Sequence, residues 1–497
     1  MSSPRVLLIG LLAGLAVATT TGCGGGGASG VSSESGASIV TSKALAFVSV
    51  DSDLGSSQWG KIDDLSHKFP GRDKALADLK KELAGQNLEW GRDIDPALGP
   101  EVDIAVARGP TLDETAIAFL TKPDDPDKFK QLVKKLDATD DGTDSTPTVY
   151  REVDGWYVAA ENTAAIDRVL KGSDGALSDN GTFGDALGKL PDDAVAKAYV
   201  NGPQLAAVLR DAQQDSSTPL TLNPSALGLD KLDFIAASLG AEDDGVRLKG
   251  VATGEGVSSL SAGDFTSKLI DGVPGDAFAF LDFRGGGLVD GVEKLRSNPT
   301  YGAGFDQFEK MLGVPLADIL DLLRNEVAFY ARPGAGIPEL SLVLDPEDRD
   351  KALATLDKLA ARVAAAAGGR VTSGMQAGHQ VKTIDFGQFA VHYAEVDGRV
   401  LITSGVTGIA DYGNGAKLAD SADFKDAKAA AGLPDSNGGF LYVDLKSAIP
   451  LIESFAGLAG EAPPEEVTAN LRPLRSFLSW NAGSGDTRTF DAFLEIK

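Results

Sequence analysis

The sequence predicts an α+β fold made of two tandem copies of one domain, each mainly antiparallel sheet with interspersed helices. Three observations predict it: an internal repeat, short β-rich runs separated by turn signals, and amphipathic helices between those runs. The chain has 497 residues, of which 43% are hydrophobic and 24% charged. That length and balance suit several packed domains.

The repeat is visible in blocks that recur in the same order. Residues 153–166 (VDGWYVAAENTAAI) match residues 396–409 (VDGRVLITSGVTGI) at an offset of 243, whereas residues 115–136 match 338–359 at an offset of 223. The change in offset places about twenty extra residues in the second copy. The period is too long for a solenoid unit. The copies therefore form either a tandem pair of domains or two halves of one pseudo-symmetric body.

Strands are expected where short runs are rich in β-branched and aromatic residues. The expected strands are 44–50, 102–107, 116–121 and 195–200 in the first copy, and 277–283, 327–331, 340–344 and 440–443 in the second. Asp154-Gly155 and Asp397-Gly398 lie between apolar runs and predict hairpin turns. The alternating run Thr489–Ile496 is expected to close a sheet.

Helices are expected between some of these strands. Phe129, Leu132, Val133 and Leu136 have helical spacing, and Asp-Pro-Asp precedes them as a start signal. Their counterparts in the second copy are Leu353, Leu356, Leu359 and Val363. Hairpins with interspersed helices favour α+β architecture with largely antiparallel sheets.

The N-terminus has the pattern of an export signal. Arg5 precedes the apolar run 6–18, whose 13 residues would span roughly 20 Å as a helix. This is shorter than the ~30 Å hydrocarbon core of a bilayer, so the run favours a cleaved signal over a membrane span. The small residues 19–22 then lead to Cys23, the only cysteine of the chain.

This junction resembles the lipobox of bacterial lipoproteins. The resemblance implies cleavage between Gly22 and Cys23 and attachment of a diacylglyceryl group to Cys23, although Thr20 stands where the family usually has an aliphatic residue. The alternative is an ordinary secretory signal that leaves a free thiol. The expected organisation is a lipoprotein signal peptide at 1–22, a Gly/Ser-rich tether at 23–42, domain A at 43–253, a linker at 254–264 and domain B at 265–497.

The combined pattern resembles a known family. The export signal with Cys23 precedes a strand, the turn Phe69-Pro70-Gly71, a helix, the segment from Trp90 to Gly99 and a strand pair. This is similar to the uncharacterised bacterial, actinobacterial-type lipoprotein family called domain of unknown function 3352. The resemblance covers nearly all of the chain beyond the signal. It implies location in the cell envelope and no particular reaction.

Charge and cysteine content exclude several classes of function. The formal net charge is −26, which would repel phosphate backbones, so no nucleic-acid partner is expected. A single cysteine permits neither an intramolecular disulfide nor a cysteine-based zinc or iron–sulfur site.

Catalytic motifs are missing from the sequence. His67, His379 and His392 have no close metal-binding spacing, and His392 is expected to be a structural or surface residue of a strand. No G-x-S-x-G elbow, phosphate loop or dinucleotide fingerprint occurs, and the glycines 285–287 are expected to form a strand-to-helix turn. No catalytic, cofactor-binding or metal-binding residue is therefore predicted.

Two clusters of acidic residues are weaker candidates for a metal or catalytic site. The stretch 137–144 fits an EF-hand loop at Asp137, Asp141 and Gly142, but position 12 is Thr148 instead of glutamate, so a solvated loop is expected. Asp51 and Asp53 could pair as acid and base, yet such neighbours are common among 72 acidic residues. Four tryptophans are expected to pack in the core or at turns: Trp59, Trp90, Trp156 and Trp480.

The expected function is that of an extracytoplasmic lipoprotein on the outer side of the cell membrane. Its partners would be the membrane, through the lipid anchor at Cys23, and an envelope protein or lipid ligand. A non-enzymatic binding or scaffold protein without a cofactor fits best, because no catalytic constellation is found. The alternatives are a carrier of a lipid or another apolar ligand and, more distantly, a carboxylate-based hydrolase of envelope polymers.

Overall fold

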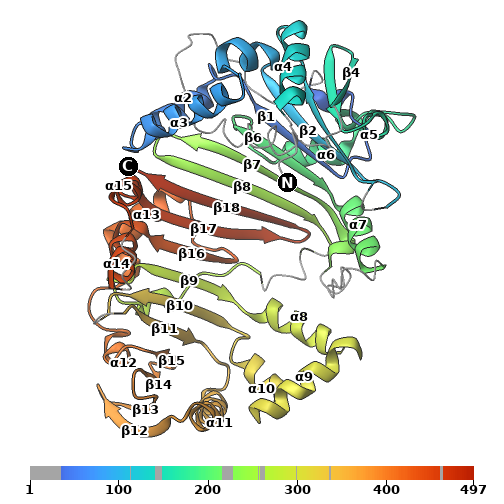
Figure 1. Cartoon of the computed structure of the whole chain (residues 1–497). Coiled ribbons are helices and arrows are strands. Elements are labelled where there is room, and N and C mark those ends of the chain that lie inside the picture. Colours follow the sequence, from blue (N-terminus) through green and yellow to red (C-terminus); the bar gives the residue numbers. More distant parts are fainter. Residues whose placement is uncertain are drawn as a thin grey trace.

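Alternating apolar and polar residues build one large sheet in the computed structural model (Figure 1). The structure describes residues 35–111, 114–139, 148–214, 228–255, 257, 263–297, 299–334, 337–458 and 463–497. Residues 1–34, which include the predicted signal peptide, Cys23 and residues 24–34 of the predicted tether, lie outside the described residues. Within them the sheet has 18 strands, and every strand pairing is antiparallel.

The first half of the chain contributes eight neighbouring strands. Their spatial order is β4-β5-β3-β2-β1-β6-β7-β8. The strands are β1 (Ala46–Asp51), β2 (Glu101–Ala107), β3 (Ala116–Thr121), β4 (Val149–Val153), β5 (Trp156–Ala160), β6 (Ala196–Asn201), β7 (Leu232–Glu242) and β8 (Gly245–Gly254).

The second half continues the same sheet. Its spatial order is β18-β17-β16-β9-β10-β11-β15-β14-β13-β12. The strands are β9 (Ala279–Arg284), β10 (Glu326–Arg332), β11 (Glu339–Leu344), β12 (Arg370–Gln376), β13 (His379–Asp385), β14 (Ala390–Val396), β15 (Arg399–Thr403), β16 (Gly439–Asp444), β17 (Leu474–Ser484) and β18 (Thr487–Ile496).

The two halves meet at β8 and β18, which pair in register from Thr253 opposite Thr487 to Gly245 opposite Glu495. Counted outward from this seam, the strands of the first half follow the order β8, β7, β6, β1, β2, β3, β5 and β4. The corresponding strands of the second half are β18, β17, β16, β9, β10, β11, β15 and β14. The second half has one additional hairpin, β12–β13, beyond β14. This hairpin lies between the helix and the VDG turn, where the change in repeat offset places the extra residues.

Helices pack on both sides of the sheet. One face, here called the covered face, is packed by α5, α6, α12 and α13, whose residues join the two largest core clusters. The α-helices are α2 (Ser57–Ser66), α3 (Arg72–Gly85), α4 (Pro126–Thr139), α5 (Thr163–Val169), α6 (Gly181–Leu187), α7 (Gly202–Gln214), α8 (Gly286–Arg296), α9 (Pro299–Leu312), α10 (Leu316–Asp321), α11 (Arg349–Ala367), α12 (Gly408–Asp411), α13 (Ala422–Ala431), α14 (Leu445–Leu458) and α15 (Glu465–Leu471). Short 3-10 or π turns are η2 (Gly36–Ser38), η3 (Trp90–Ile94), η4 (Asp95–Ala97), η6 (Leu177–Asp179), η7 (Leu229–Lys231), η9 (Leu269–Gly272) and η10 (Leu418–Asp420).

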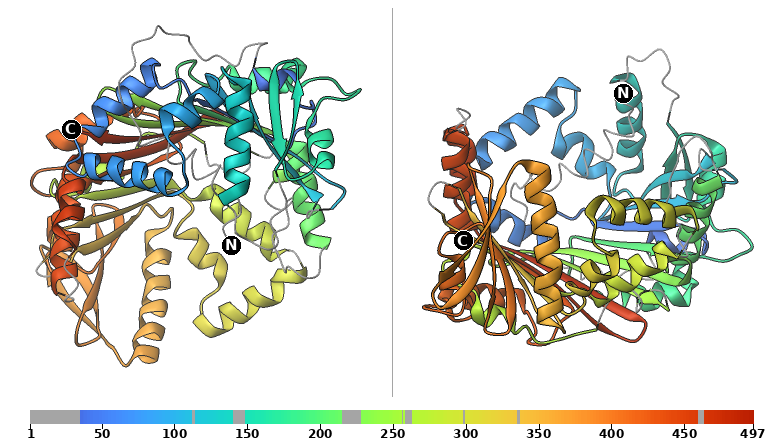
Figure 2. Two further views of the ribbon diagram at one scale, coloured as in Figure 1. Left: turned by 45° about the horizontal axis from the view of Figure 1, so that its top comes forward. Right: turned by 90° about the horizontal axis from the view of Figure 1, so that it is seen from below.

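The opposite face, here called the open face, is covered only in part. Helix α2 packs Leu65 against the ends of the central strands β7, β8, β17 and β18, and two further helices cover outer strands. Helix α4 packs near β3 and β5, and α11 packs near β11 and β15. Figure 1 shows the central strands β8, β18, β17 and β16 with no helix in front of them. In Figure 2 the blue, yellow and orange helices stand on one side of the sheet and leave its middle strands between them.

The last part of the expected tether is folded. Residues 35–42 contain η2, and Val40 and Thr41 form isolated bridges with Leu170 and Ala176. Ile39 and Val40 belong to the first-half core. The predicted tether therefore extends too far along the chain, because residues 35–42 belong to the folded body. Two apolar residues within this Gly/Ser-rich stretch pack in the core and hold the stretch there.

The predicted hairpin turns and the two predicted helices are confirmed. Both Asp-Gly pairs form the turns of hairpins, with φ of 53° and 82° at Asp154 and Gly155, and 49° and 80° at Asp397 and Gly398. Positive φ at both central residues is the geometry for which this dipeptide is favoured. The two predicted helices are present as α4 and α11.

Candidate apolar binding surface

The three histidines do not form a site. His67 directly follows α2 as its C-terminal cap residue, and its Nδ1 lies 2.8 Å from the carbonyl oxygen of Asp63. His392 lies on β14 with its Nδ1 2.9 Å from Thr383 Oγ1, and burial lowers the pKa of its imidazole. His379 begins β13. Among the described residues, no group of three or more histidine, cysteine, aspartate or glutamate side chains could hold a metal ion.

Asp51 and Asp53 have structural partners at the entry to α2. Asp51 accepts hydrogen bonds from the Ser56 hydroxyl (2.6 Å) and the Asp53 amide (3.0 Å), and Asp53 accepts one from the Gly55 amide (2.9 Å). Burial raises the pKa of Asp51. Trp59 donates its indole N–H to the Asp51 carbonyl at 2.9 Å. These contacts fix the turn between β1 and α2.

The other candidates also have structural places. Residues 140–147 of the acidic stretch lie outside the described residues, and Asp137 accepts a hydrogen bond from the Thr148 amide at 3.2 Å. The glycines 285–287 form the expected strand-to-helix turn, since β9 ends at Arg284 and α8 begins at Gly286. Trp59 and Trp156 are buried in the core.

The sheet has an unusual distribution of polarity between its two faces. Residues paired across antiparallel strands point to the same side, so the register assigns each side chain to a face. The covered face carries charged and hydroxyl-bearing side chains: Asp103, Lys197, Tyr199, Arg247, Asp282, Glu326, Tyr330, Arg332 and Asp491. The open face of the central strands carries mainly Ile, Leu, Val, Phe, Ala and Gly.

Large apolar side chains on this open face are accessible to solvent. Leu248 of β8 is 39% exposed, and Phe490 of β18 is 43% exposed. The residues that we call the apolar strip are Ile117, Ile235, Leu239, Leu248, Leu281, Phe329, Leu340 and Phe490, all between 37% and 55% exposed. Sequence alternation could have suggested such residues, but alternation alone does not tell which face the helices cover.

A hollow of about 480 Å³ lies on the strip where the halves meet. Its apolar lining includes Ile235, Leu248, Val257 and Phe490, from or near β7, β8 and β18. Asn481 and Arg488 contribute polar atoms at its margin, and the described residues that line it include no carboxylate. Concave apolar surfaces with few polar groups are typical of ligand sites.

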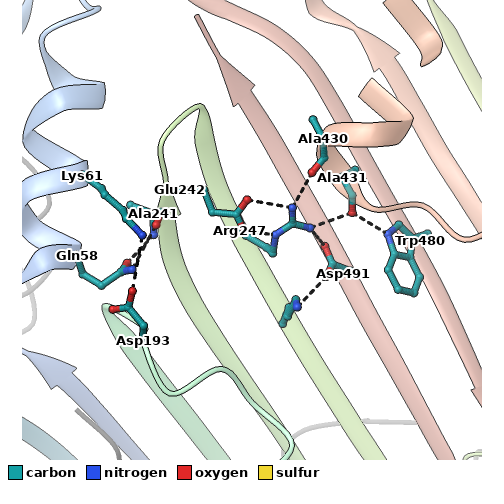
Figure 3. A network of polar contacts seen from close by, with 11 residues as sticks. Gln58, Lys61, Asp193, Ala241, Glu242, Arg247, Ala430, Ala431, Trp480 and Asp491 are labelled. Atoms are coloured by element: carbon teal, nitrogen blue, oxygen red, sulfur yellow. Dashed lines mark hydrogen bonds and ion pairs between the residues drawn. The ribbon is translucent and has the colours of Figure 1, made fainter. Parts of the chain in front are cut away.

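The seam beneath the hollow is held by a charged network on the covered face (Figure 3). Arg247 donates to Asp491 Oδ1 at 2.7 Å and to the carbonyl oxygens of Ala430 (2.7 Å) and Ala431 (2.9 Å), and it also pairs with Glu242. Its guanidinium lies 4.6 Å from the centre of the Phe493 ring. This network connects β8 of the first half with β18 and the end of α13.

Two buried carboxyl groups lie elsewhere on the covered face. Asp103 on β2 and Asp282 on β9 are fully buried, and none of their carboxyl oxygens makes a hydrogen bond of normal geometry with the described residues. Burial raises the pKa of Asp282 to about 7, and burial together with the neighbouring Glu101 raises that of Asp103. These carboxyls face helices and turns of the core rather than the open face.

Fold and surface together define a mixed α/β protein with an extended antiparallel sheet, one face of which is apolar and open. Among the described residues, no helix has both the length and the apolar character needed to cross a bilayer. The chain belongs to the family described as "Protein of unknown function (DUF3352)", whose family model matches residues 5–496.

The curated proteins contain no match to this chain. Two solved structures, crystal forms IV and I of TP0453, are similar at 12% and 11% sequence identity. They cover 46% and 47% of this chain and 94% and 92% of their own, with TM-scores of 0.24 and 0.21. At such scores the likeness carries no argument about this chain.

Proposed function

We propose that this protein is a non-enzymatic lipoprotein on the outer side of the cell membrane that binds an apolar ligand on its open sheet face. It would be anchored by a diacylglyceryl group on Cys23 after cleavage between Gly22 and Cys23. The observation that carries the binding function is the apolar strip, which places large apolar side chains on an uncovered face.

The energetics of the strip support a ligand. Antiparallel sheets with one solvated face normally carry polar residues on that face. Covering an exposed Leu or Phe contributes about 1.5–3 kcal/mol per side chain relative to full exposure, and large exposed apolar patches usually mark interaction sites. A ligand that covers the half-exposed strip would therefore gain most of its affinity from hydrophobic contact.

The envelope location fits the same ligand class. Two acyl chains on Cys23 would hold the protein stably at a membrane, even with its net charge of −26. That charge disfavours attraction to anionic head groups. Recognition would then rest on the hydrocarbon part of a membrane molecule rather than on its head group. We therefore prefer a carrier or binder of lipid-like molecules to a scaffold for proteins.

We also propose that residues 43–253 and 265–497 are two copies of one domain, joined by the linker 254–264. The repeated blocks, the matching strand order and the single extra hairpin β12–β13 support this history. The duplication would explain the ligand surface: pairing of the two terminal hairpins at β8 and β18 makes a sheet wide enough to leave its middle uncovered.

The test is to purify the full chain from its own membranes and weigh it by native mass spectrometry before and after organic extraction. We expect an extractable mass in stoichiometric amount, separate from the acyl mass on Cys23. Leu248→Asp and Phe490→Asp should lose this mass, whereas Val406→Asp, at a residue exposed outside the strip, should keep it. A lipidated protein with no other bound mass would contradict the proposal.

A further inference from the structure

We infer that the outward edge of strand β12, here called the free edge, pairs with the free edge of a second copy of this chain. The two strands would be antiparallel and related by a twofold axis at Ser373. This inference goes beyond the proposed function, because it concerns one end of the sheet and needs no ligand. It follows from the exposure of β12, the geometry of its hairpin and its self-complementary sequence.

Strand β12 is one of the two outermost strands of the sheet and lies at its lower end in Figure 1. Among the described strands, it pairs with β13 alone. Residues 370–375 of this strand are exposed, and they include the apolar side chains of Val371 (38%) and Met375 (71%). An outermost strand presents backbone amides and carbonyls to any chain that can pair with it.

The other outermost strand, β4, is protected against such pairing, whereas β12 is not. Charged side chains are a common protection of sheet edges. Strand β4 contains Arg151 and Glu152, and Arg151 pairs with Asp167 of α5 at 2.6 Å. Residues 371–375 of β12 are Val, Thr, Ser, Gly and Met, and no proline or carboxylate occurs in the strand. In a chain with 72 acidic residues, this edge is the one at which pairing is least opposed.

The hairpin determines which backbone groups of β12 point outward. Two residues, Ala377 and Gly378, join β12 to β13 with φ of 51° and 87°. In a two-residue hairpin of this kind, the pair that flanks the turn is hydrogen-bonded, and bonded and non-bonded pairs then alternate along the strands. Counted from the turn, the amides and carbonyls of Val371, Ser373 and Met375 therefore point away from β13 and towards the free edge.

A second β12 fits this edge in a centred register. With Ser373 opposite its own copy, Val371 of each chain lies opposite Met375 of the other. These are the residues whose backbone groups point outward, so each opposite pair exchanges two hydrogen bonds. Opposite residues share a face, so the two exposed apolar side chains cover each other twice. Arg370, the one charged residue of β12, lies opposite Gln376 of the second copy, so no like charges meet.

Pairing of this kind closes at two chains. The first half has no counterpart of the β12–β13 hairpin and ends at β4. Each chain therefore offers one unprotected edge, and an interface that uses the same surface of both copies forms a closed dimer. The hollow lies at β7, β8 and β18 in the middle of the sheet, so the dimer leaves it accessible.

Cross-linking of the full chain in intact cells tests the inference. Ser373→Cys places the β-carbons of two cysteines about 5 Å apart in the dimer, within reach of a short, membrane-permeant bis-maleimide. We expect it to give a covalent dimer. Ser484→Cys makes the same change at an exposed residue of β17 and should give no more dimer than wild type. Cys23 is present in every variant, so a cross-link through it would appear equally in all.

A proline separates strand pairing from other contacts. Met375→Pro, added to Ser373→Cys, removes an outward amide and none of the hydrogen bonds to β13. It should abolish the cross-link without lowering the thermal unfolding midpoint. No dimer with Ser373→Cys, or equal amounts with Ser373→Cys and Ser484→Cys, would overturn the inference. A cross-link that persists in the folded proline variant would also overturn it, because the contact would then not be a strand pair.

Discussion

Lys249 of β8 and Asp491 of β18 are directly opposite each other at the seam, with Nζ 4.0 Å from Oδ2. Each is the fifth residue of its strand, and they form the middle pair of the registered residues of β8 and β18. A twofold relation between the halves would therefore pass between these two side chains. The charge pair at this point marks the register that joins the two halves.

Removing the carboxylate of Asp491 should weaken this seam. Asp491→Ala leaves the largely buried Arg247 guanidinium without its 2.7 Å ionic partner, although Glu242 and two carbonyl oxygens remain. We expect a loss of about 2 kcal/mol in the free energy of unfolding. Urea unfolding measures it. Glu466→Ala, which removes an exposed ion pair between α15 and Lys74 of α3, is the control and should change stability little. Equal effects of the two variants would contradict a special role for the seam.

Two glycines provide a matched test of where the folded body begins. A Cβ at Gly36 would overlap the buried Asp103 carboxyl, whereas one at Gly60 in α2 would meet nothing within 4 Å. Gly36→Ala should destabilise the protein by about 1–3 kcal/mol through overpacking. Gly60→Ala should stabilise it by about 0.5–1 kcal/mol, because alanine favours helix. Thermal unfolding of both variants is the measurement, and a neutral Gly36→Ala would mean that residues 35–42 belong to the tether.

The sequence predicts the local parts of this fold well. The turns at Asp154 and Asp397, the helical stripe that begins at Phe129 and the strand 116–121 depend on neighbours within a few residues, so their signals are complete in short windows. The repeat also places the extra residues where β12 and β13 lie.

The surface could not be predicted in the same way. Alternation in Ile235 to Leu239 indicates two unlike faces, but the face that receives the helices depends on contacts with α6 and α13 far along the chain. The charged residues Arg247 and Lys249 suggest a solvated face, whereas the structure turns them towards the covered face. The seam itself depends on residues more than 230 positions apart, which no local window contains.

Stability should fall with increasing pH because of Asp282. Burial raises the pKa of this carboxyl in the folded protein to about 7, from the 3.8 of an ordinary aspartate. The folded state then binds more protons than the unfolded state between about pH 4 and pH 7, so the free energy of unfolding decreases as pH rises through that window and levels off above it. The size of the effect is on the order of 4 kcal/mol.

Asp282→Asn tests this dependence, because it removes the titrating proton and keeps the shape. Urea unfolding at pH 5 and pH 8 should reveal a smaller loss of stability in the variant than in the wild type, and the variant should be the more stable of the two at pH 8. Asp423→Asn, at an exposed carboxyl of α13, should keep the wild-type difference. If wild type and Asp282→Asn lost equal stability between the two pH values, the burial of Asp282 would not be the cause.

Two phenylalanines of β18 separate the roles of the two faces. Phe490 lies on the open face at 43% exposure, whereas Phe493, three residues later, lies on the covered face within the second-half core and beneath Arg247. Phe493→Ala should cost about 3–5 kcal/mol of folding free energy, because it leaves a cavity. Phe490→Ala should change stability by less than about 1 kcal/mol and should reduce binding of an environment-sensitive apolar dye, since it removes surface rather than packing.

Urea unfolding and dye fluorescence, measured on both variants, therefore distinguish a binding face from a core face. A large stability loss in Phe490→Ala with unchanged dye binding would contradict this prediction. It would mean that the apolar side chains of the open face stabilise the fold and do not form a binding surface.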